Sequence, residues 1–329
     1  MKVLFCYKED FEKLLKKLIN RYKIFAPVEG VFGVSFAPLT YDNMDKICLF
    51  RARLPQSLKW FFYPPSEAVT EEFQFEDYII VGAKACDLRA VKILDKIFLE
   101  GDFVDDFYKV RREKGLIIAT DCTEPTEYCF CTLLGNKPYP EEGADLSIAE
   151  IERGYLIDVM TERGENLLRE LNLREAEKED IERREENRKK VIERIKDINK
   201  EFKSLENVSN VIKGLYDSEV WREYGEKCVE CGACTMVCPS CHCFLLQESV
   251  VREFGKNRVW DSCQYTGFAR EAGGANPRKE VFERLRNRYY CKFQYKPENF
   301  DLVACTGCGR CIAACQGGID MREVLSKML

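Results

Sequence analysis

Histidine is almost missing from this chain: one of its 329 residues, His242, is a histidine. No Ser-His-Asp arrangement is present, so the sequence offers little for hydrolytic or general acid–base catalysis. No Gly-x-Gly-x-x-Gly loop follows a predicted strand, so no dinucleotide site of that kind is encoded.

Long apolar runs and a strong excess of one charge are also missing. No stretch reaches the roughly 18 apolar residues of a membrane span. The first residues become charged by Lys8, without the apolar core of a secretory signal. The net charge of −5 and the lack of an aromatic and basic stripe argue against a nucleic-acid partner. We therefore expect a cytoplasmic protein with no membrane span.

What the sequence has in excess is cysteine, with 18 residues. Structural disulfides are not expected in a reducing cytosol, so most of these cysteines are predicted to be metal ligands. The length favours more than one domain, and the 46% of apolar residues suffice for a packed core.

Composition divides the chain into three regions, which together predict an α+β protein. We expect an α/β domain, a charged helical connector and a cysteine-rich ferredoxin-like domain with a large insert, at 1–160, 161–222 and 223–329. In the connector, 20 of the 29 residues from 174 to 202 are charged, and one apolar stripe has helical spacing: Val191, Ile195, Ile198 and Phe202. We interpret it as a solvated helix with one buried face, with partner docking as the alternative.

The first region shows both helical and strand patterns. Apolar residues at helical spacing predict a helix over 9–22. Two short apolar strands, 78–82 and 116–119, each run into a loop that carries a cysteine, Cys86 and Cys122. We therefore expect a small sheet that presents ligands at one edge.

Two motifs of the third region have the cysteine spacing of a bacterial ferredoxin. Residues 228–239 read Cys-x2-Cys-x2-Cys-x3-Cys-Pro, and residues 305–315 repeat the four cysteines. In two-cluster ferredoxins the fourth cysteine of each run ligates the other cluster. We therefore predict two [4Fe–4S] clusters, the first held by Cys228, Cys231, Cys234 and Cys315 and the second by Cys305, Cys308, Cys311 and Cys238.

Paired zinc ribbons are the alternative, but two runs of four cysteines exceed what zinc requires. Gln316 stands where ferredoxins carry proline, which loosens the local turn and leaves the ligands unchanged. Gly232 and Gly309 each follow the second cysteine of a motif, and we expect the chain to pass close to cluster sulfide there.

An insert of 66 residues separates Cys238 from Cys305. A family resemblance rests on three short sequences of this insert, CPSCHCF, WDSCQ and AGGANPR. Four further sequences elsewhere in the chain support it: CTGCGRC, GAKACDL, YKVRREKG and EYCFC. The chain resembles the iron–sulfur beta subunit of cytosolic nickel–iron hydrogenases of the sulfhydrogenase type, and equally the A subunit of anaerobic sulfite reductase. The resemblance covers most of the chain from about residue 78 onward, while 30–75 and 160–220 match nothing comparable.

The resemblance implies an electron-transfer subunit without bond chemistry of its own. Such a subunit relays single electrons in a hetero-oligomer, between a flavin subunit that handles NAD(P)H and a catalytic metal subunit. A nickel–iron hydrogenase is the expected complex, and an anaerobic sulfite reductase or another flavin-linked complex is the alternative. Two other interpretations remain. In one, the clusters only stabilise the structure; in the other, the chain is an enzyme that binds substrate itself, for example at a cluster iron with an open coordination position.

Four cysteines of the first region form a candidate third [4Fe–4S] site: Cys86, Cys122, Cys129 and Cys131. They fall in predicted loops, and the resemblance places them in the family's N-terminal motifs; scattered buried thiols are the alternative. We expect five charged residues around this site: Lys84, Asp87, Arg89, Arg111 and Arg112. They donate hydrogen bonds to cluster sulfide or dock a partner, or they are plain surface charge. Arg310, inside the second motif, is best placed to raise a cluster potential.

The insert holds a candidate further metal site, formed by Cys241, Cys243, Cys263 and Cys291, with His242 between the first two. Structural thiols beside the clusters are the alternative reading. Cys6 and Cys48 remain, and we expect both to be ordinary buried cysteines.

Overall fold

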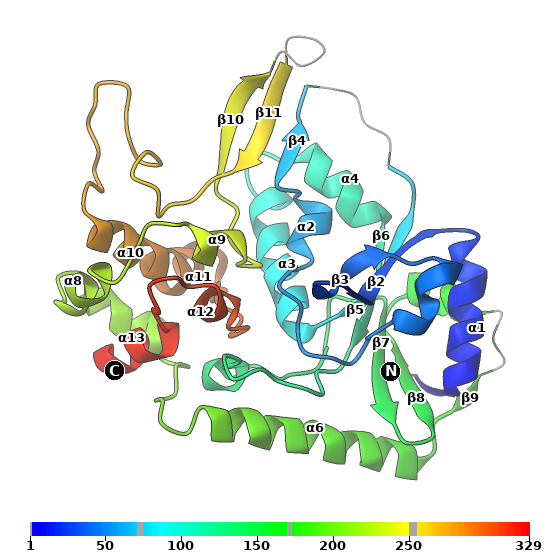
Figure 1. The fold of residues 1–329 in the computed structure, drawn as a ribbon. Helices are drawn as coiled ribbons and strands as arrows, with labels where there is room; N and C mark the ends of the chain where they lie inside the picture. The colour runs from blue at the N-terminus through cyan, green and yellow to red at the C-terminus, as the bar shows by residue number, and fades with distance from the viewer. Residues whose placement is uncertain (1, 71–74, 170, 172, 250–254) are drawn as a thin grey trace.

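An eight-stranded mixed sheet organises the first half of the chain (Figure 1). The computed structural model describes residues 2–70, 75–169, 171, 173–249 and 255–329. The strand order is β3-β2-β5-β6-β7-β8-β1-β9; β2, β5, β6 and β7 run parallel, and the other pairs are antiparallel. The strands are β1 (Val3–Cys6), β2 (Lys23–Gly30), β3 (Gly33–Pro38), β5 (Tyr78–Ala83), β6 (Gly115–Thr120), β7 (Leu146–Ile151), β8 (Gly154–Val159) and β9 (Arg174–Glu175).

Helices cover both faces of this sheet because alternate strand residues point to opposite sides. Ile79 and Val81 of β5 pack in one core with α1 (Lys8–Ile19) and α5 (Glu162–Leu168). Ile80 packs in another core with α2 (Lys59–Phe62), α3 (Ala85–Phe98) and α4 (Asp106–Lys114). The predicted N-terminal helix, both predicted strands and the α+β class are therefore confirmed.

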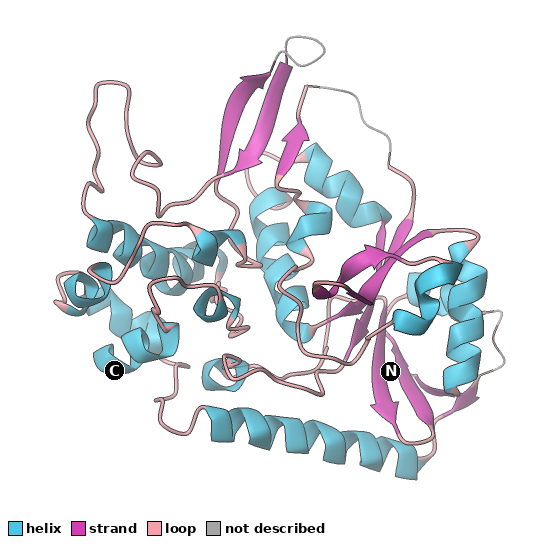
Figure 2. Ribbon diagram, in the orientation of Figure 1, coloured by secondary structure: helices cyan, strands magenta, loops and turns pink. Residues whose placement is uncertain are grey.

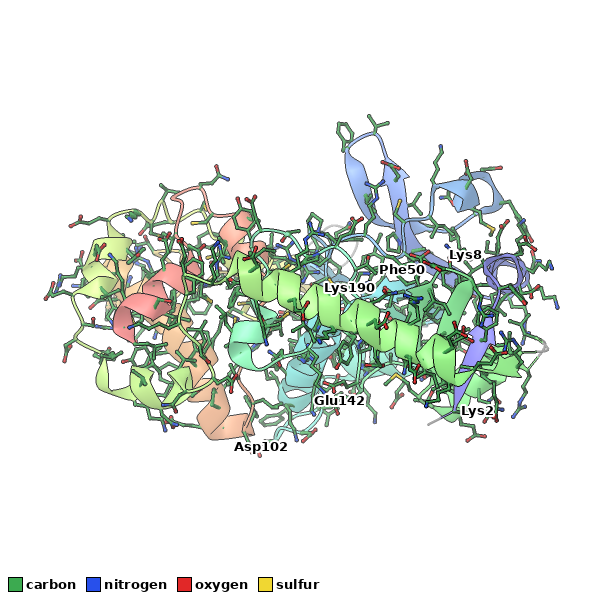
Figure 3. All side chains as sticks on the ribbon, turned by 90° about the horizontal axis from the view of Figure 1, so that it is seen from below. Lys2, Lys8, Phe50, Asp102, Glu142 and Lys190 are labelled. Carbon is green, nitrogen blue, oxygen red and sulfur yellow. The ribbon has the colours of Figure 1, made fainter. Side chains whose placement is uncertain are left out.

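Helix α6 (Lys178–Ile198) runs along one side of the molecule, with Lys190 on its surface (Figure 3). Val191 and Ile195 of the predicted apolar stripe are buried, while Ile198 and Phe202 are only partly covered. The helix also buries Arg184, whose Nη1 donates to the Asp158 carboxylate in β8 over 2.9 Å. The connector is therefore held against the sheet by ion pairs as well as by apolar contacts.

The remaining chain is mostly helix and loop (Figure 2). Its core is built around Trp221, Tyr289 and Phe293. The helices are α7 (Val208–Val211), α8 (Val220–Gly225), α9 (Ala233–Met236), α10 (Val281–Tyr290), α11 (Lys296–Phe300), α12 (Arg310–Ala313) and α13 (Met321–Met328). A π-helical segment, η4 (Cys291–Tyr295), joins α10 to α11. The 3-10 helices of the chain are η1 (Tyr41–Lys46) and η2 (Cys131–Leu134) in the first region and η3 (Ile212–Gly214) in the connector.

Strand pairing crosses two of the predicted domain boundaries. The insert forms a three-stranded sheet, β10 (Phe244–Ser249), β11 (Gly255–Trp260) and β4 (Ser66–Ala68), and β4 comes from the first region. Strand β9 of the connector pairs with β1. The boundaries at 160 and 222 therefore stay a prediction. Of the helices described, none is long and apolar enough to cross a membrane.

Candidate metal centres

The first expected ligand set lines one cavity of the C-terminal region. Cys228, Cys231, Cys234 and Cys315 all border it, with Cys311 beside them. Gly232 turns the chain between Cys231 and α9 in the left-handed conformation, with φ 70°. A Cβ on this glycine would lie 2.6 Å from the ring of Tyr265, so the tight approach is to that ring. Cys231 is exposed, so this set reaches the molecular surface.

The second expected set lines a separate cavity. Its cysteines are Cys238, Cys305, Cys308 and Cys311, and Lys292 and Arg288 lie among them. Cys238 comes from the first motif and Cys315 from the second, so each motif sends its last cysteine to the other cavity. The fold thus brings together each group of four that the spacing predicted.

The four cysteines of the first region also converge. Cys86 lies in the first turn of α3, Cys122 follows β6, and Cys129 and Cys131 flank the start of η2. Burial raises the pKa of Cys122 to about 11, and the neighbouring Cys129 adds to the shift. Burial likewise raises the pKa of Cys131 to about 12, the neighbouring Cys122 and Cys129 add to the shift, and Cys86 interacts with Cys129. These thiols share one buried environment.

The insert cysteines are divided between two neighbourhoods. A hydrogen bond from Cys243 lowers the pKa of Cys263 to about 6, and Cys291 interacts with Cys243. Cys241 lies instead against Cys238 of the second set. Within the described residues, no three His, Cys, Asp or Glu side chains are grouped to hold a single metal ion.

The only histidine lies beside this group without a charge. Burial, reinforced by the nearby Lys296 ammonium, lowers the pKa of His242 to about 3. The Lys296 Nζ lies 2.9 Å from His242 Nδ1, and the ring nitrogen accepts a hydrogen bond from the ammonium. His242 is therefore a neutral acceptor at pH 7.

The second motif packs backbone to backbone against the loop of Cys129 and Cys131. Phe130 N donates to Gly307 O over 2.8 Å. A Cβ on Gly307 would lie 2.4 Å from Cys131 Cα, and one on Gly309 would lie 2.0 Å from Tyr128 O. Both glycines have positive φ, at 69° and 70°. Gly309 therefore admits the neighbouring backbone of the first region, and its expected closeness to cluster sulfide stays a prediction.

The charged residues expected near the N-terminal site separate into two groups. Lys84 is buried, and its Nζ donates to Leu49 O, Thr120 Oγ1 and Asp121 O. Asp87 pairs with Arg310, and Arg89 donates to Lys137 O. Arg111 and Arg112 are in ion pairs on α4, with Glu67 and Asp95 respectively. The prediction that these two arginines serve the cluster gains no support, because carboxylates already hold them.

The side chains that sequence reasoning missed are four buried cations on one helix: Arg284, Arg288, Lys292 and Lys296. Their exposed fractions are 2, 4, 3 and 5%. They recur every fourth residue, which was the available signal, although such basic stripes usually face solvent. Here they face the cysteine groups.

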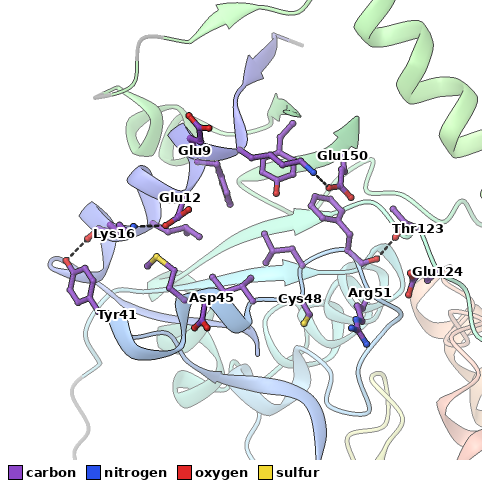
Figure 4. A pocket seen from close by; sticks show the side chains of 18 residues that line it. Glu9, Glu12, Lys16, Tyr41, Asp45, Cys48, Arg51, Thr123, Glu124 and Glu150 are labelled. Carbon is purple, nitrogen blue, oxygen red and sulfur yellow. Dashed lines mark hydrogen bonds and ion pairs between the residues drawn. The ribbon is translucent and has the colours of Figure 1, made fainter. Parts of the chain in front are cut away.

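The two cysteines without an expected role differ in their burial. Cys6 is buried as predicted, whereas Cys48 is only partly buried, so that part of the prediction is wrong. Cys48 lines a surface cavity of about 800 Å³ between α1 and the segment leading to Arg51 (Figure 4). Charges of both signs border this cavity, among them Glu12 and Arg51. No predicted ligand is among its lining residues.

Comparisons with known proteins agree with this geometry. Residues 227–319 match the model of a 4Fe-4S dicluster domain. The whole chain is 30% identical over 344 residues to sulfhydrogenase 2 subunit beta of Pyrococcus furiosus, covering 100% of this chain and 98% of that protein. The match includes the segments 30–75 and 160–220, in which the sequence alone showed no resemblance.

Proposed function

Because the chain belongs to the family of iron–sulfur beta subunits of sulfhydrogenases, we propose a specific role for it as an electron-transfer subunit. It relays single electrons in a cytoplasmic complex, between a subunit that handles flavin and NAD(P) and the catalytic subunit of a nickel–iron hydrogenase. Each bound [4Fe–4S] cluster takes up and releases one electron, at a potential set by its surroundings. This chain supplies thiolates, burial and fixed charge.

The observation that carries the proposal is the exchange of cysteines between two neighbouring cavities. Each cavity is bordered by three cysteines of one motif and the last cysteine of the other, and Cys311 borders both. This is the ligand pattern of two-cluster ferredoxins. We therefore assign the first cluster to Cys228, Cys231, Cys234 and Cys315 and the second to Cys305, Cys308, Cys311 and Cys238.

Cationic side chains around the second cavity support an anionic group within it. Lys292 Nζ donates to Cys238 Sγ over 3.1 Å, and Arg288 borders both cavities. Buried cations are costly unless an opposite charge lies nearby. A cluster held by four thiolates is anionic and meets that requirement.

The N-terminal group is proposed to hold a third [4Fe–4S] cluster. Cys86 interacts with Cys308 of the second set as well as with Cys129. The second site then neighbours the third, and its cavity shares Cys311 and Arg288 with the cavity of the first, which reaches the surface at Cys231. Neighbouring sites of this kind suit the stepwise transfer of single electrons.

The insert group is a weaker candidate for a fourth site. Cys243 is hydrogen-bonded to Cys263 and interacts with Cys291, and Lys59 and Lys296 add positive charge around them. Cys241, however, lies against Cys238. Cys263→Ala tests this site: a cluster held here would be lost with about four irons per chain, and an unchanged iron content would remove the assignment.

Iron and sulfide counts on the anaerobically reconstituted chain test the number of clusters. We expect about twelve of each for three clusters and about sixteen if the insert group also binds one. About eight would leave only the dicluster.

Co-purification of the native complex tests the partners. We expect a flavin-containing subunit and a nickel–iron subunit, with hydrogen uptake linked to NAD(P). Sulfite reduction without hydrogen uptake would favour the anaerobic sulfite reductase alternative.

A further inference from the structure

Four buried cations form a stripe along the helix that passes the cysteine groups. Arg284, Arg288, Lys292 and Lys296 are spaced four residues apart across α10, η4 and the start of α11. All four are at least 95% buried, with exposed fractions of 2, 4, 3 and 5%. Arg284 pairs with the Glu230 carboxylate, whereas among the described residues no carboxylate pairs with the other three. Three such buried cations are unusual, because an unpaired buried charge costs several kcal/mol in general.

The π-helical segment explains how the stripe stays on one face. In an α-helix with 3.6 residues per turn, side chains four apart drift by about 40° at each step. A π turn has more residues per turn than an α turn, so side chains four residues apart in it fall short of a full turn. This shift is opposite to the drift in the α-helix and offsets it. The segment Cys291–Tyr295 lies inside the stripe and holds Lys292. The helix therefore continues to point its cations at the cysteines.

Lys292 makes a direct contact with a predicted cluster ligand. Its Nζ donates to Cys238 Sγ over 3.1 Å, to Ser240 Oγ over 3.0 Å and to Ala304 O over 3.4 Å. These acceptors fix the ammonium at the wall of the second cavity. Among the described residues, no carboxylate lies within ion-pair distance of it.

Arg288 lies between the two cavities and has hydrogen-bonding capacity left over. Its Nη2 donates to Cys234 O over 3.4 Å, and its guanidinium also contacts Cys311. Its Nε is buried and has no hydrogen-bond partner in the part of the chain that the structure describes. Cys234 belongs to the first set and Cys311 to the second. The unpartnered Nε–H of Arg288 therefore has a sulfur atom of a bound cluster as its expected acceptor.

We propose that Arg288 and Lys292 are positioning residues that set the reduction potentials of the two clusters. The inference rests on the proposed dicluster. Positive charge and hydrogen bonds at the thiolate sulfur stabilise the more negative, reduced cluster and raise its potential. Lys292 acts on the second cluster alone, and Arg288 acts on both. The pair thereby determines which cluster holds the electron at equilibrium.

The test is a potentiometric titration of the reconstituted full chain, followed by EPR. We expect Lys292→Met to lower the reduced-to-oxidised ratio of one cluster about tenfold at fixed potential, which is 59 mV for a one-electron couple. Arg288→Met is expected to lower the ratio for two clusters. Lys292→Gln keeps a donor and loses the charge, so it should give a smaller shift than Lys292→Met.

Lys279→Met is the matched control, since it removes the same charge from an exposed side chain just before α10. We expect this variant to titrate like the unmodified chain. Iron content is measured on every variant. If Lys292→Met loses iron, the potentials of Lys292→Gln and Lys292→Arg are compared instead, because only the second keeps the positive charge. Equal potentials in the loaded Lys292 variants and the control would overturn the inference while leaving the dicluster intact. An unmodified chain that binds no dicluster would overturn the proposed function itself.

Discussion

Arg310 Nη2 donates a hydrogen bond to Asp87 Oδ2 over 3.0 Å, in an ion pair that is almost wholly buried. Asp87 directly follows Cys86, and Arg310 lies two residues after Cys308. Arg310 Nε also donates to Leu54 O over 2.7 Å. The pair therefore fastens the second cysteine motif to the N-terminal cysteine group.

Asp87→Asn is expected to destabilise the protein by about 3–5 kcal/mol, because it leaves the Arg310 charge buried without its partner. The measurement is the urea midpoint of the reconstituted chain under anaerobic conditions. Glu142→Gln, which breaks the exposed pair with Lys92, serves as the control and should leave the midpoint unchanged. Equal midpoints for the two variants would show that the buried pair does not join the regions.

Gly309→Ala is expected to lower the retained iron and the urea midpoint more than Gly318→Ala does. Both glycines have positive φ, at 70° and 66°, so both variants incur the roughly 1–2 kcal/mol of left-handed strain. A Cβ at Gly309 would also meet Tyr128 O at 2.0 Å, whereas nothing lies within 4 Å of one at Gly318. If the two variants behave alike, the close backbone approach is not needed.

Cys129→Ala is expected to remove about four irons per chain, because Cys129 lies at the centre of the N-terminal group. Iron and sulfide analysis after anaerobic reconstitution measures this loss. Cys48→Ala is the matched control, since Cys48 borders a surface cavity and is not a predicted ligand. An iron content equal to that of the control would exclude a third cluster at this group.

Cys6 is expected to resist alkylation in the folded protein at pH 9. Burial, with a smaller contribution from Asp10, raises the pKa of its thiol to about 12, so the thiolate needed for reaction is scarce below that pH. Peptide mass spectrometry after iodoacetamide treatment, with and without urea, measures the modification. Modification at equal rates in both conditions would contradict the buried environment.

Local patterns were enough to predict α1, β5, β6 and the cysteines of the two ferredoxin-like motifs, but not the division of the insert cysteines between two neighbourhoods. The spacing of Cys228, Cys231 and Cys234 implies a cluster loop by itself, and the apolar repeat around Leu14 implies α1. Long-range contacts could not be predicted in this way. The buried pair of Arg310 and Asp87 joins residues that lie 223 positions apart, and nothing local marks them as partners.

The buried cations show a second limit of sequence reasoning. Basic residues at every fourth position normally predict a solvated helix face, and Arg288 and Lys292 would be read so. They are buried because the cysteine motifs, far away in sequence, pack against that face. Conversely, Arg111 and Arg112 were expected near a cluster, but the fold gives them carboxylate partners.

Dithionite reduction of the reconstituted chain, followed by visible absorbance and EPR, tests the electron-transfer role most directly. We expect the brown absorbance to bleach reversibly, with the uptake of at least one electron for each cluster of the dicluster and an EPR signal from reduced clusters. An absorbance that does not bleach, or a reduced sample without an EPR signal, would contradict the relay and leave the clusters a purely structural role.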